Sequence, residues 1–475
     1  MSEFKLRDYQ QDAVDASIHY INSAEKRPGA IIAPTAAGKS WIIGAIAKAH
    51  KNPILVLQPS IELLKQNFDK FKKLGGDASI YSAGAGSKEI GHVTYATLGS
   101  IKNDAYRFKE AGVDLIIIDE CHMGIKPDKG SMFMNFISTL KPKKSIGLTA
   151  TPFRLKNNMM GSRLVMLNRM KPGYFRHFIH VSQISEMIDR GYWTQSVDES
   201  WIQDESSLIL NTTGSDFTEE SIKEYAKVNG INNKIYLRVI DAVKQGRKSL
   251  LVFTDSTESC KIFVDHLTKQ GISCDFLTSD TKKSKREKSI ENFKSGKTTV
   301  MFNYGILGTG FDHPPLDGII MGRPTNSLAI FYQIYGRGVR VLEGKEDFLF
   351  ADYGNNFKRM AHPREIIIEN YPGHGWGVFC GEKLVTGVYL SDEMIITKAD
   401  LDGEAEEIQS DLFFKFGKHE GKMVVDIVRS NPDYVAWLGS QPWIDSTFKT
   451  KMMLILKKSQ LGMLKNEVDA GSKRF

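Results

Sequence analysis

The stretch that decides the fold is Ile31-Ile32-Ala33-Pro34-Thr35-Ala36-Ala37-Gly38-Lys39-Ser40. It reads as a buried apolar strand, a loop of small residues, and then Lys-Ser opening a helix. Small residues let backbone N–H groups approach phosphates, and the helix N-terminus adds favourable partial charge. Lys39 would reach the β- and γ-phosphates, and Ser40 would ligate Mg²⁺. The stretch predicts a polyphosphate-binding loop, although a core strand followed by a capped helix would use similar residues.

Composition narrows the class of protein. The chain has 475 residues, 41% hydrophobic and 25% charged, as expected of a globular protein with about three domains. Its formal charge of +7 is compatible with a polyanionic partner without requiring one. The four cysteines form no C-x-x-C pair, so we expect neither a disulfide framework nor a cysteine-rich zinc site. Without a signal sequence or a long apolar run, we expect a cytoplasmic protein with no membrane partner, in the host cytoplasm if the chain comes from a bacteriophage.

Apolar strands alternate with helices after the loop, and two of them stop at polar residues, Asp119-Glu120-Cys121-His122 and Thr149-Ala150-Thr151-Pro152. Uninterrupted apolar strands separated by helices are typical of a parallel sheet covered on both faces. Ligands of such sheets bind beyond the carboxyl ends of the strands, so the loop and the two polar tetrads should meet at one site. The predicted strands cover residues 53–57, 92–95, 114–118 and 145–148.

A second alternation of strands and helices begins near Asn229. Within it, the basic run from Lys282 to Lys288 is either the solvated first turn of a helix or a contact to a phosphate backbone. The pattern predicts an α/β chain with a second parallel sheet. Its predicted strands cover residues 248–253, 298–302, 318–321 and 348–350.

The polar residues suit phosphoryl transfer. Asp119 would hold Mg²⁺ through water and Glu120 would orient or deprotonate the attacking water, although a carboxylate pair at a strand end can also be a helix cap. Arg337 and Arg340 are three residues apart, which would put both on one face of a helix. Alone they would be surface salt-bridge partners. Together with a phosphate loop, they favour an arginine finger that neutralises charge on the γ-phosphate.

Five motifs follow one another in the order PTAAGKS, DECH, LTATP, NYGILGTGFD and QIYGRGVR. This ordered set, which covers about Phe4 to Asn356, resembles superfamily 2 helicases and translocases. The resemblance implies two tandem RecA-like domains, with ATP bound between them and nucleic acid running across both. The chain departs from the family pattern at Ala37, where glycine is common, and at Asn303, where threonine is common. Both residues are small or polar, so the departures concern rate and affinity more than activity.

The resemblance assigns roles by position. The catalytic residues would be Lys39, Asp119, Glu120, Gln333, Arg337 and Arg340. The ATP and Mg²⁺ site would comprise Arg7, Gln10, Pro34, Thr35, Ala36, Ala37, Gly38, Lys39, Ser40, Gly310 and Asp312, with Ser40 and Asp119 as the metal ligands. The residues coupling hydrolysis to domain movement would be His122, Thr149 and Thr151.

Contacts to a nucleic-acid strand are also implied by the family register. Hydroxyls, backbone amides and helix N-termini are what phosphate contacts require, so binding should be largely independent of base sequence. Read singly, each of these stretches would more often be an ordinary loop. The residues are Pro59, Ser60, Thr94, Thr97, Thr254, Asp255, Ser256, Asn303, Tyr304 and Gly305.

The branch of the superfamily is indicated by DECH, by the GRGVR ending and by Phe350 to Asn356. These most resemble RadD-like and bacteriophage branch-migration (UvsW-like) helicases, which act on DNA, and they imply 3′ to 5′ polarity. DECH also occurs among RNA helicases, and the chain lacks the cysteines of the RadD-like zinc module.

Two segments stand apart from the motifs. Residues 154–176 interleave basic residues with methionines and aromatics, which suits either a strand-separating element or, slightly better, a plain interdomain connection. Residues 412–438 resemble a small module at the C-terminus of exonuclease X-like proteins. Its basic and aromatic residues would suit DNA ends or junctions, although Tyr434 and Trp437 at helical spacing are commonly core. The pair His419-Glu420 is too little for a metal site.

The predicted domains follow from this division. They are a first RecA-like domain over 1–176 with a basic connecting loop over 154–176, an interdomain connection over 177–228, a second RecA-like domain over 229–356, and a C-terminal accessory α+β region over 357–475 with its module at about 411–465.

We expect an ATP hydrolase of superfamily 2, acting as a DNA helicase or translocase in unwinding or branch migration during repair or recombination. The expected partners are single-stranded, forked or branched DNA, and replication or recombination proteins through the C-terminal module. The alternatives are an RNA helicase, or an ATP-gated clamp on duplex or branched nucleic acid that does not unwind processively.

Overall fold

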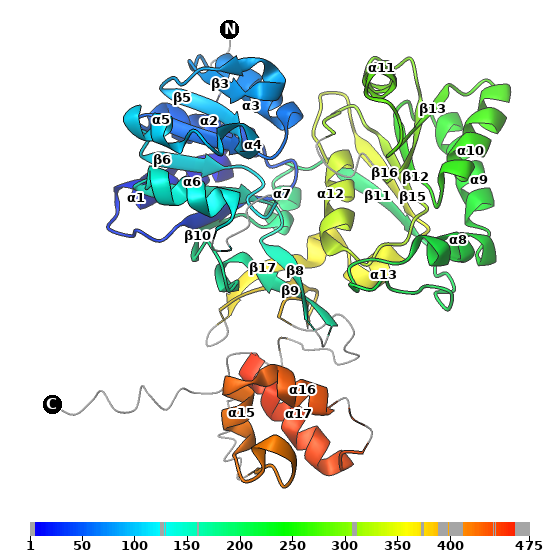
Figure 1. The fold of residues 1–475 in the computed structure, drawn as a ribbon. Helices are drawn as coiled ribbons and strands as arrows, with labels where there is room; N and C mark the ends of the chain where they lie inside the picture. Colours follow the sequence, from blue (N-terminus) through cyan, green and yellow to red (C-terminus); the bar gives the residue numbers. More distant parts are fainter. Residues whose placement is uncertain are drawn as a thin grey trace. The chain divides into compact units, whose positions relative to one another are not determined.

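The computed structural model describes residues 5–123, 128, 130–158, 161–305, 311–371, 375–387, 398, 412–439, 441 and 443–460. The chain divides into two compact units. Unit 1 comprises residues 1–152, 167–211 and 216–364, and unit 2 comprises residues 153–166, 212–215 and 365–475. Unit 1 contains two large sheets, and unit 2 contains a hairpin, a small antiparallel sheet and the C-terminal helices (Figure 1).

The first sheet of unit 1 has the strand order β10-β1-β7-β6-β2-β5-β3-β4, and its pairs are parallel except β3 with β4. Its central strands are fully buried, because their apolar side chains face helices on both sides. The strands are β1 (Gly29–Ile32), β2 (Ile54–Gln58), β3 (Ser79–Ser82), β4 (Ser87–Lys88), β5 (Val93–Thr97), β6 (Leu115–Ile118), β7 (Lys144–Thr149) and β10 (His177–Val181).

Helices connect these strands. They are α1 (Asp8–Asn22), α2 (Lys39–Ala49), α3 (Ile61–Lys73), α4 (Leu98–Ile101), α5 (Ala105–Glu110), α6 (Met132–Leu140) and α7 (Ile184–Asp189), with 3₁₀ turns η1 (Ala83–Ala85) and η2 (Leu167–Arg169).

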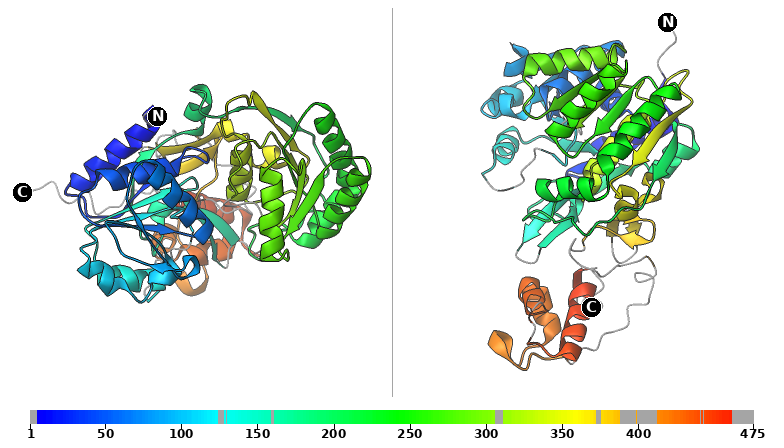
Figure 2. Two further views of the ribbon diagram at one scale, coloured as in Figure 1. Left: turned by 90° about the horizontal axis from the view of Figure 1, so that it is seen from above. Right: turned by 90° about the vertical axis from the view of Figure 1, so that its right-hand side faces the viewer.

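The second sheet of unit 1 is parallel throughout, in the order β11-β16-β15-β12-β14-β13. Helices α9 and α10 cover one face and α12 covers the other (Figure 2). The strands are β11 (Gln195–Ser200), β12 (Leu250–Phe253), β13 (Cys274–Thr278), β14 (Val300–Tyr304), β15 (Gly318–Met321) and β16 (Asp347–Asp352). The helices are α8 (Glu219–Val228), α9 (Ile231–Lys244), α10 (Thr257–Lys269), α11 (Lys283–Lys294), α12 (Leu328–Gly338) and α13 (Asn356–Met360), followed by η3 (Pro363–Glu365).

The two predicted parallel sheets are confirmed, and every strand predicted for them is present close to its predicted ends. Sequence reasoning missed β3, β4, β10, β11 and β13. Four of these are edge strands and β3 is next to an edge, and in all five the apolar run is short or absent. Strand β11, for example, is polar and largely exposed.

The segment from 177 to 228, predicted as an interdomain connection, contributes to both sheets. Strand β10 pairs with β1 in the first sheet, whereas β11 pairs with β16 in the second. Helix α8 supplies Tyr225 and Ala226 to the core of the second sheet. The crossing between the sheets is therefore confined to the residues between β10 and β11, which include α7.

Unit 2 begins with an antiparallel hairpin, β8 (Phe153–Asn158) and β9 (Gly161–Met166), where the sequence predicted a basic loop. Leu164 of this hairpin forms a bridge with Thr386. A small sheet, β17 (Ile366–Tyr371), β18 (Gly375–Cys380) and β19 (Lys383–Leu384), follows. The C-terminal helices are η4 (Gly417–His419), α15 (Val424–Ser430), α16 (Pro432–Gly439) and α17 (Ser446–Gln460).

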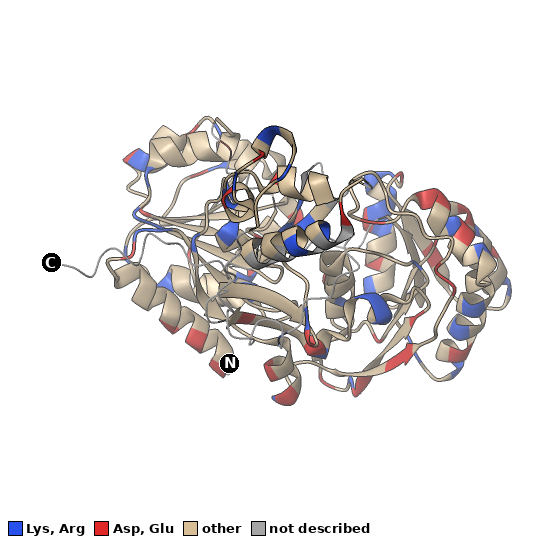
Figure 3. Cartoon of the chain, turned by 90° about the horizontal axis from the view of Figure 1, so that it is seen from below, with Lys and Arg blue, Asp and Glu red and all other residues tan. Residues whose placement is uncertain are grey.

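Lys and Arg residues are interspersed with Asp and Glu residues along the outer helices, as the modest net charge implies (Figure 3). Within the described residues, no helix combines the length and apolar character needed to cross a membrane.

Candidate active site

The loop between β1 and α2 lies at the carboxyl end of the first sheet and is held by the start of α1. The Tyr9 hydroxyl and the Gln10 amide nitrogen Nε2 both donate to the Ala37 carbonyl, each at 2.9 Å. Gly38 caps α2 with φ of 76°, and a Cβ there would lie 2.5 Å from Gln10 Nε2. Glycine is therefore needed at 38 both for its backbone conformation and for the approach of Gln10.

The strain in this loop lies at Ala36 rather than at Ala37. Ala36 has φ of 61°, in the left-handed region, whereas Ala37 does not have positive φ. Glycine relieves strain only where φ is positive. An alanine therefore costs conformational energy at position 36, whereas the departure from the family pattern noted in the sequence is at position 37.

Glu120 lies opposite the loop lysine. Lys39 Nζ is 3.3 Å from Glu120 Oε1, and the Glu120 backbone, with φ of 43°, donates its N–H to Asp119 Oδ1 at 2.9 Å. Burial raises the pKa of Asp119, and the charge of Glu120 raises it further, while Lys39 opposes both effects. A cation at this position would therefore stabilise the ionised Asp119.

Asn67 of α3 joins the two predicted metal ligands. The Ser40 hydroxyl donates to Asn67 Oδ1 at 2.5 Å, and Asn67 Nδ2 donates to Asp119 Oδ2 at 2.9 Å. A hydroxyl and a carboxylate are oxygen donors of the kind that Mg²⁺ prefers. The Ser40 hydroxyl and the Asp119 carboxylate therefore fit a magnesium ion, and Asn67 orients both of them through its hydrogen bonds.

The residues predicted to couple hydrolysis to movement form a connected set. His122 Nδ1 lies 2.7 Å from Thr149 Oγ1 and 3.4 Å from Glu120 Oε2. Thr149 Oγ1 accepts the Thr151 backbone N–H at 3.0 Å. The ends of β6 and β7 are thereby linked to Glu120 through one histidine.

Helix α12 of the second sheet packs directly on the loop. The Tyr332 hydroxyl accepts the Thr35 backbone N–H at 3.2 Å. One turn further along, a Cβ at Gly336 would lie 1.9 Å from Thr35 Oγ1. Gln333 is half-buried on the same helix. The two sheets of unit 1 therefore meet at the phosphate loop.

Arg337 and Arg340 do not share a helical face as predicted, because α12 ends at Gly338 and Arg340 lies beyond it. Arg337 is buried and donates to the Phe311 carbonyl. Burial lowers its pKa to about 10, and the charge of Glu120 acts in the opposite direction, so Arg337 stays ionised near that carboxylate. Arg340 instead forms an ion pair with Asp312.

Asp312 connects the second sheet to α3. It accepts from Gln66 and Arg340, and its Oδ2 lies 3.7 Å from Lys70 Nζ. Burial, together with the charge of Arg340, lowers the pKa of Lys70 to about 8. Gly310, predicted beside Asp312, lies outside the described residues.

The remaining predicted nucleotide ligands surround the loop. The Arg7 guanidinium lies 4.9 Å from the centre of the Tyr192 ring, and the Arg7 N–H donates to Gln10 Oε1 at 3.0 Å. The Pro34 carbonyl accepts the Ala37 N–H at 3.2 Å. Tyr192 is anchored in turn through its hydroxyl, which donates to Asp8 at 2.8 Å.

The predicted strand-contact residues fall into two groups. Ser60 and Ser256 cap α3 and α10, and Thr97 precedes α4, so all three lie at helix N-termini after strand ends, with Pro59 just before α3. Several of the predicted residues are buried, namely Ser256 itself, Thr94, Thr254, Asp255 and Asn303, and Tyr304 is half-buried. Gly305, with φ of 74°, is exposed after β14.

Sequence reasoning missed Tyr9, Gln66, Asn67, Lys70 and Tyr332. One signal could have found Asn67: it lies between Leu64 and Phe71 at helical spacing, a polar residue within an apolar stripe. The others contact the site only because distant segments fold together, so no local pattern marks them.

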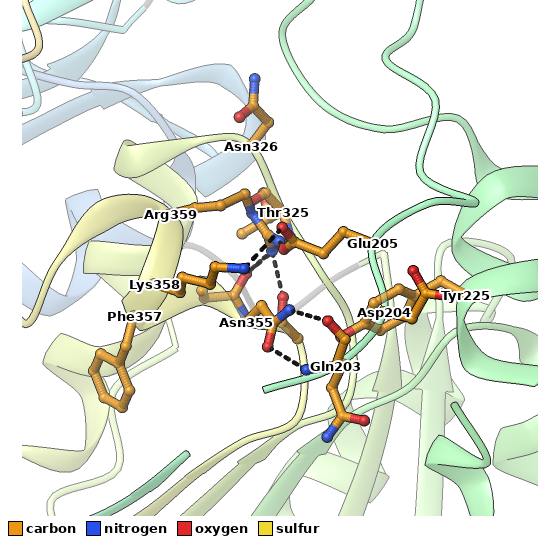
Figure 4. A network of polar contacts seen from close by, with 12 residues as sticks. Gln203, Asp204, Glu205, Tyr225, Thr325, Asn326, Asn355, Phe357, Lys358 and Arg359 are labelled. Carbon is orange, nitrogen blue, oxygen red and sulfur yellow. Dashed lines mark hydrogen bonds and ion pairs between the residues drawn. The ribbon is translucent and has the colours of Figure 1, made fainter. Parts of the chain in front are cut away.

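A buried polar network holds the segment before α12 (Figure 4). Asn356 Oδ1 accepts the Thr325 N–H at 2.9 Å, and its Nδ2 donates to Asp352 at 2.8 Å. Asn355 exchanges two hydrogen bonds with the Gln203 backbone, and Arg359 pairs with Glu205. The segment after β16, noted from the sequence, thus fixes the start of the helix that carries Arg337.

Comparison with known proteins identifies families that match parts of this chain. Residues 3–154 match the family described as "Type III restriction enzyme, res subunit". Residues 232–342 match "Helicase conserved C-terminal domain", and residues 414–439 match "Exodeoxyribonuclease X-like C-terminal". The first two families cover the phosphate loop with its carboxylates and the helix with its arginines, in that order. Two domains of this chain therefore match these two families, and relatives of the chain are named as ATP-dependent helicases.

Several relatives of this chain are named as helicases or translocases. A Saccharomyces cerevisiae protein named as the ATP-dependent helicase IRC3 is 28% identical over 73% of this chain and 51% of its own length. The Schizosaccharomyces pombe protein named irc3 is 26% identical over 75% and 58%. "DNA 3'-5' translocase XPB2" of Sulfurisphaera tokodaii is 35% identical over 32% of each chain. The chain spans only about half the length of the first two relatives.

Solved structures share the fold of this chain. A fragment named as an HsdR subunit of a type I restriction enzyme from Vibrio vulnificus has a TM-score of 0.54, at 22% identity over 75% of this chain and 66% of its own. The Type ISP restriction-modification enzyme LlaBIII bound to DNA has a TM-score of 0.50, at 18% identity over 74% of this chain and 28% of its own. The predicted fold, two RecA-like domains with a C-terminal extra region, is confirmed.

Proposed function

We propose that this chain is an ATP-dependent DNA translocase or helicase that remodels duplex or branched DNA. The main support for the proposal is that residues from both sheets of unit 1 meet at the phosphate loop. Lys39, Ser40 and Glu120 approach it from the first sheet, and Gly336 of α12 approaches it from the second. Hydrolysis at such a loop changes how tightly the two sheets pack, which is the coupling a motor needs.

In the proposed reaction, the loop amides and Lys39 bind the phosphates of ATP. Ser40 and Asp119 would hold Mg²⁺, which neutralises phosphate charge when bound. Glu120 would orient the attacking water and accept its proton, while Arg337 would stabilise charge developing on the γ-phosphate. Arg340, in its ion pair with Asp312, would position the carboxylate that contacts Gln66 and Lys70 of α3 rather than act on the phosphate.

The proposed polarity is 3′ to 5′ and the proposed location is the cytoplasm, or the host cytoplasm for a bacteriophage protein. The polarity is supported by the name of the translocase relative and by the resemblance to branch-migration helicases. The helix N-termini at Ser60, Thr97 and Ser256 would contact strand phosphates without reading bases.

The decisive experiment measures ATP hydrolysis by the full chain with no nucleic acid, single-stranded DNA, a four-way junction or structured RNA. We expect strong stimulation by junction or single-stranded DNA. Lys39→Ala should abolish it, and Glu120→Gln should reduce the rate by about 10²–10⁴-fold while sparing nucleotide binding. Lys48→Ala, an exposed change on the same helix α2, is the matched control.

The results separate the alternatives. Stimulation by RNA alone would replace the DNA proposal with an RNA helicase. Hydrolysis without displacement of strands bearing 3′ or 5′ tails would favour the ATP-gated clamp, and displacement only from 5′ tails would overturn the polarity. Absence of hydrolysis under all conditions would overturn the motor itself.

A further inference from the structure

The C-terminal module carries an exposed aromatic surface that the proposed motor does not use. The module, residues 412–456, has its own core, in which Phe414, Val424 and Leu438 are buried. Trp437 and Trp443 nevertheless remain 51% and 61% exposed. Large aromatic side chains left outside a well-packed core are typical of a binding surface.

A series of contacts brings the two tryptophans to one loop. The Trp437 and Tyr434 ring centres are 5.8 Å apart, and those of Trp443 and Phe416 are 5.7 Å apart. These pairs approach at Gly417, which follows Phe416 directly and where an added Cβ would lie 3.0 Å from the Tyr434 hydroxyl. Both exposed indoles therefore border the loop 417–422.

The loop 417–422 is basic. Lys418 and Lys422 are exposed, and Lys418 Nζ lies 5.2 Å from the centre of the Tyr434 ring. Burial lowers the pKa of the His419 imidazole, and the charges of Lys418 and Lys422 also lower it. Within the described part of the chain, neither ring nitrogen of His419 has a hydrogen-bond partner. Because both ring nitrogens of His419 are themselves buried, the groups that suit a phosphate at this loop are the two exposed ammonium groups.

We propose that this surface binds an unpaired DNA strand, with a phosphate at the loop 417–422 and bases stacked on Trp437 and Trp443. Exposed rings beside lysines are the combination that holds single strands, because every base has a π-face and every nucleotide a charge. An acidic peptide would pair with the lysines but would leave both indole faces unused. The choice of DNA rests on the proposed function, whereas the stacking and charge do not.

The test uses the full chain without nucleotide, so that hydrolysis does not enter the result. Binding of a fluorescein-labelled oligothymidylate is followed by anisotropy. We expect the Trp437→Ala/Trp443→Ala double variant to bind at least about tenfold more weakly. Tyr106→Ala, which removes a 63% exposed ring from α5 in unit 1, should bind as the unchanged protein does.

A strand of abasic sites separates stacking from charge. It retains the phosphates but offers no bases, so the unchanged protein and the double tryptophan variant should bind it equally. Lys418→Gln/Lys422→Gln should weaken binding to both strands and reduce the salt dependence, by about 0.7 in the log–log slope for each phosphate that the variant no longer neutralises. Lys223→Gln/Lys261→Gln, at exposed positions on α8 and α10, is the charge-matched control.

The outcomes that overturn the proposal are distinct. Equal oligothymidylate binding by the double tryptophan variant and by Tyr106→Ala would show that this surface does not bind the strand. If the double tryptophan variant lost the same affinity for the abasic strand, the loss would not come from base stacking. The variant Trp437→Phe/Trp443→Phe, which retains aromatic rings, would then fail to restore affinity. A tryptophan dependence seen only with oligouridylate would replace DNA by RNA. Failure of the proposed motor would instead appear as absent ATP hydrolysis, independently of these titrations.

Discussion

Gly336 of α12 lies against Thr35 of the phosphate loop so closely that one added carbon would sit 1.9 Å from Thr35 Oγ1 and 2.4 Å from its Cβ. Two sheets formed by separate halves of unit 1 therefore meet with no space for a methyl group between them. The loop that binds phosphates in the proposed reaction is also the surface on which α12 of the second sheet packs. In the proposed reaction, a movement of Thr35 towards α12 would displace that helix.

Gly336→Ala should uncouple the sheets. The new methyl group has to push α12 away from Thr35, which withdraws Arg337 from Glu120, so we expect nucleic-acid-stimulated hydrolysis to fall at least about tenfold. Steady-state hydrolysis checks this, with Ile330→Ala, an exposed change on the same helix, as control. Thr35→Gly in the Gly336→Ala background should recover part of the loss. Unchanged rates in Gly336→Ala would show that this contact is not needed.

Asn67→Ala should weaken Mg²⁺ binding without removing a metal ligand. Because Asn67 orients both Ser40 and Asp119, its loss should raise the Mg²⁺ concentration for half-maximal binding of a fluorescent ATP analogue by about 10–100-fold. Asn135→Ala, at an exposed position on α6, is the control. An identical Mg²⁺ titration in both variants would contradict the role of Asn67.

Glycine substitutions in the phosphate loop should have opposite effects at neighbouring positions. Ala36→Gly relieves a left-handed alanine, which costs about 1–2 kcal/mol, and should stabilise the protein by up to about 1 kcal/mol after the entropy cost of glycine. Ala37→Gly relieves nothing and should destabilise by about 0.5–1 kcal/mol. Urea unfolding measures both, and changes of the same sign would contradict the loop geometry.

His313 should make stability fall as the solution is acidified. Burial lowers its pKa to about 4, with Lys294 and Lys345 adding to the shift, and its Nε2 lies 3.0 Å from Ser249 Oγ. Below pH 6.5 the unfolded chain therefore takes up a proton that the folded chain refuses, and stability is lost progressively towards pH 4. His313→Gln should show a shallower loss between those values in urea unfolding. Parallel profiles would rule out this contribution.

Asn356→Ala should loosen the segment that leads into α12. It leaves the buried Thr325 N–H without its side-chain acceptor and removes a donor from Asp352, at a cost of about 1–3 kcal/mol. Hydrogen exchange should rise at the amides around Thr325 and in the first turn of α12. Asn52→Ala is the control, because it removes only a surface hydrogen bond from the Asn52 amide to Asp114. It should leave the exchange of those amides unchanged.

How much of the site the sequence predicted depends on how local each signal is. The polar tetrads after β6 and β7 were predictable as one site, because parallel strands end at one edge and their apolar runs mark where they end. The arginines were only half predictable: their spacing is consistent with one helical face, but the end of α12 at Gly338 depends on packing that the spacing does not report. Asn67 is marked in the sequence only as a polar residue within an apolar stripe of α3, and no local pattern marks Tyr332 as a site residue.

By itself, the sequence determined the two parallel sheets, the loop, the carboxylates and the order of the motifs, because buried strands and tight turns restrict residue types within a few neighbouring positions. The tertiary structure alone decided which partners meet. Thr35 and Tyr332 are 297 positions apart, and Gln66 and Asp312 are 246 apart. Such contacts arise when separately formed layers pack together, and each partner's local sequence is compatible with many others. The same packing separates Arg337, held near Glu120, from Arg340, paired with Asp312.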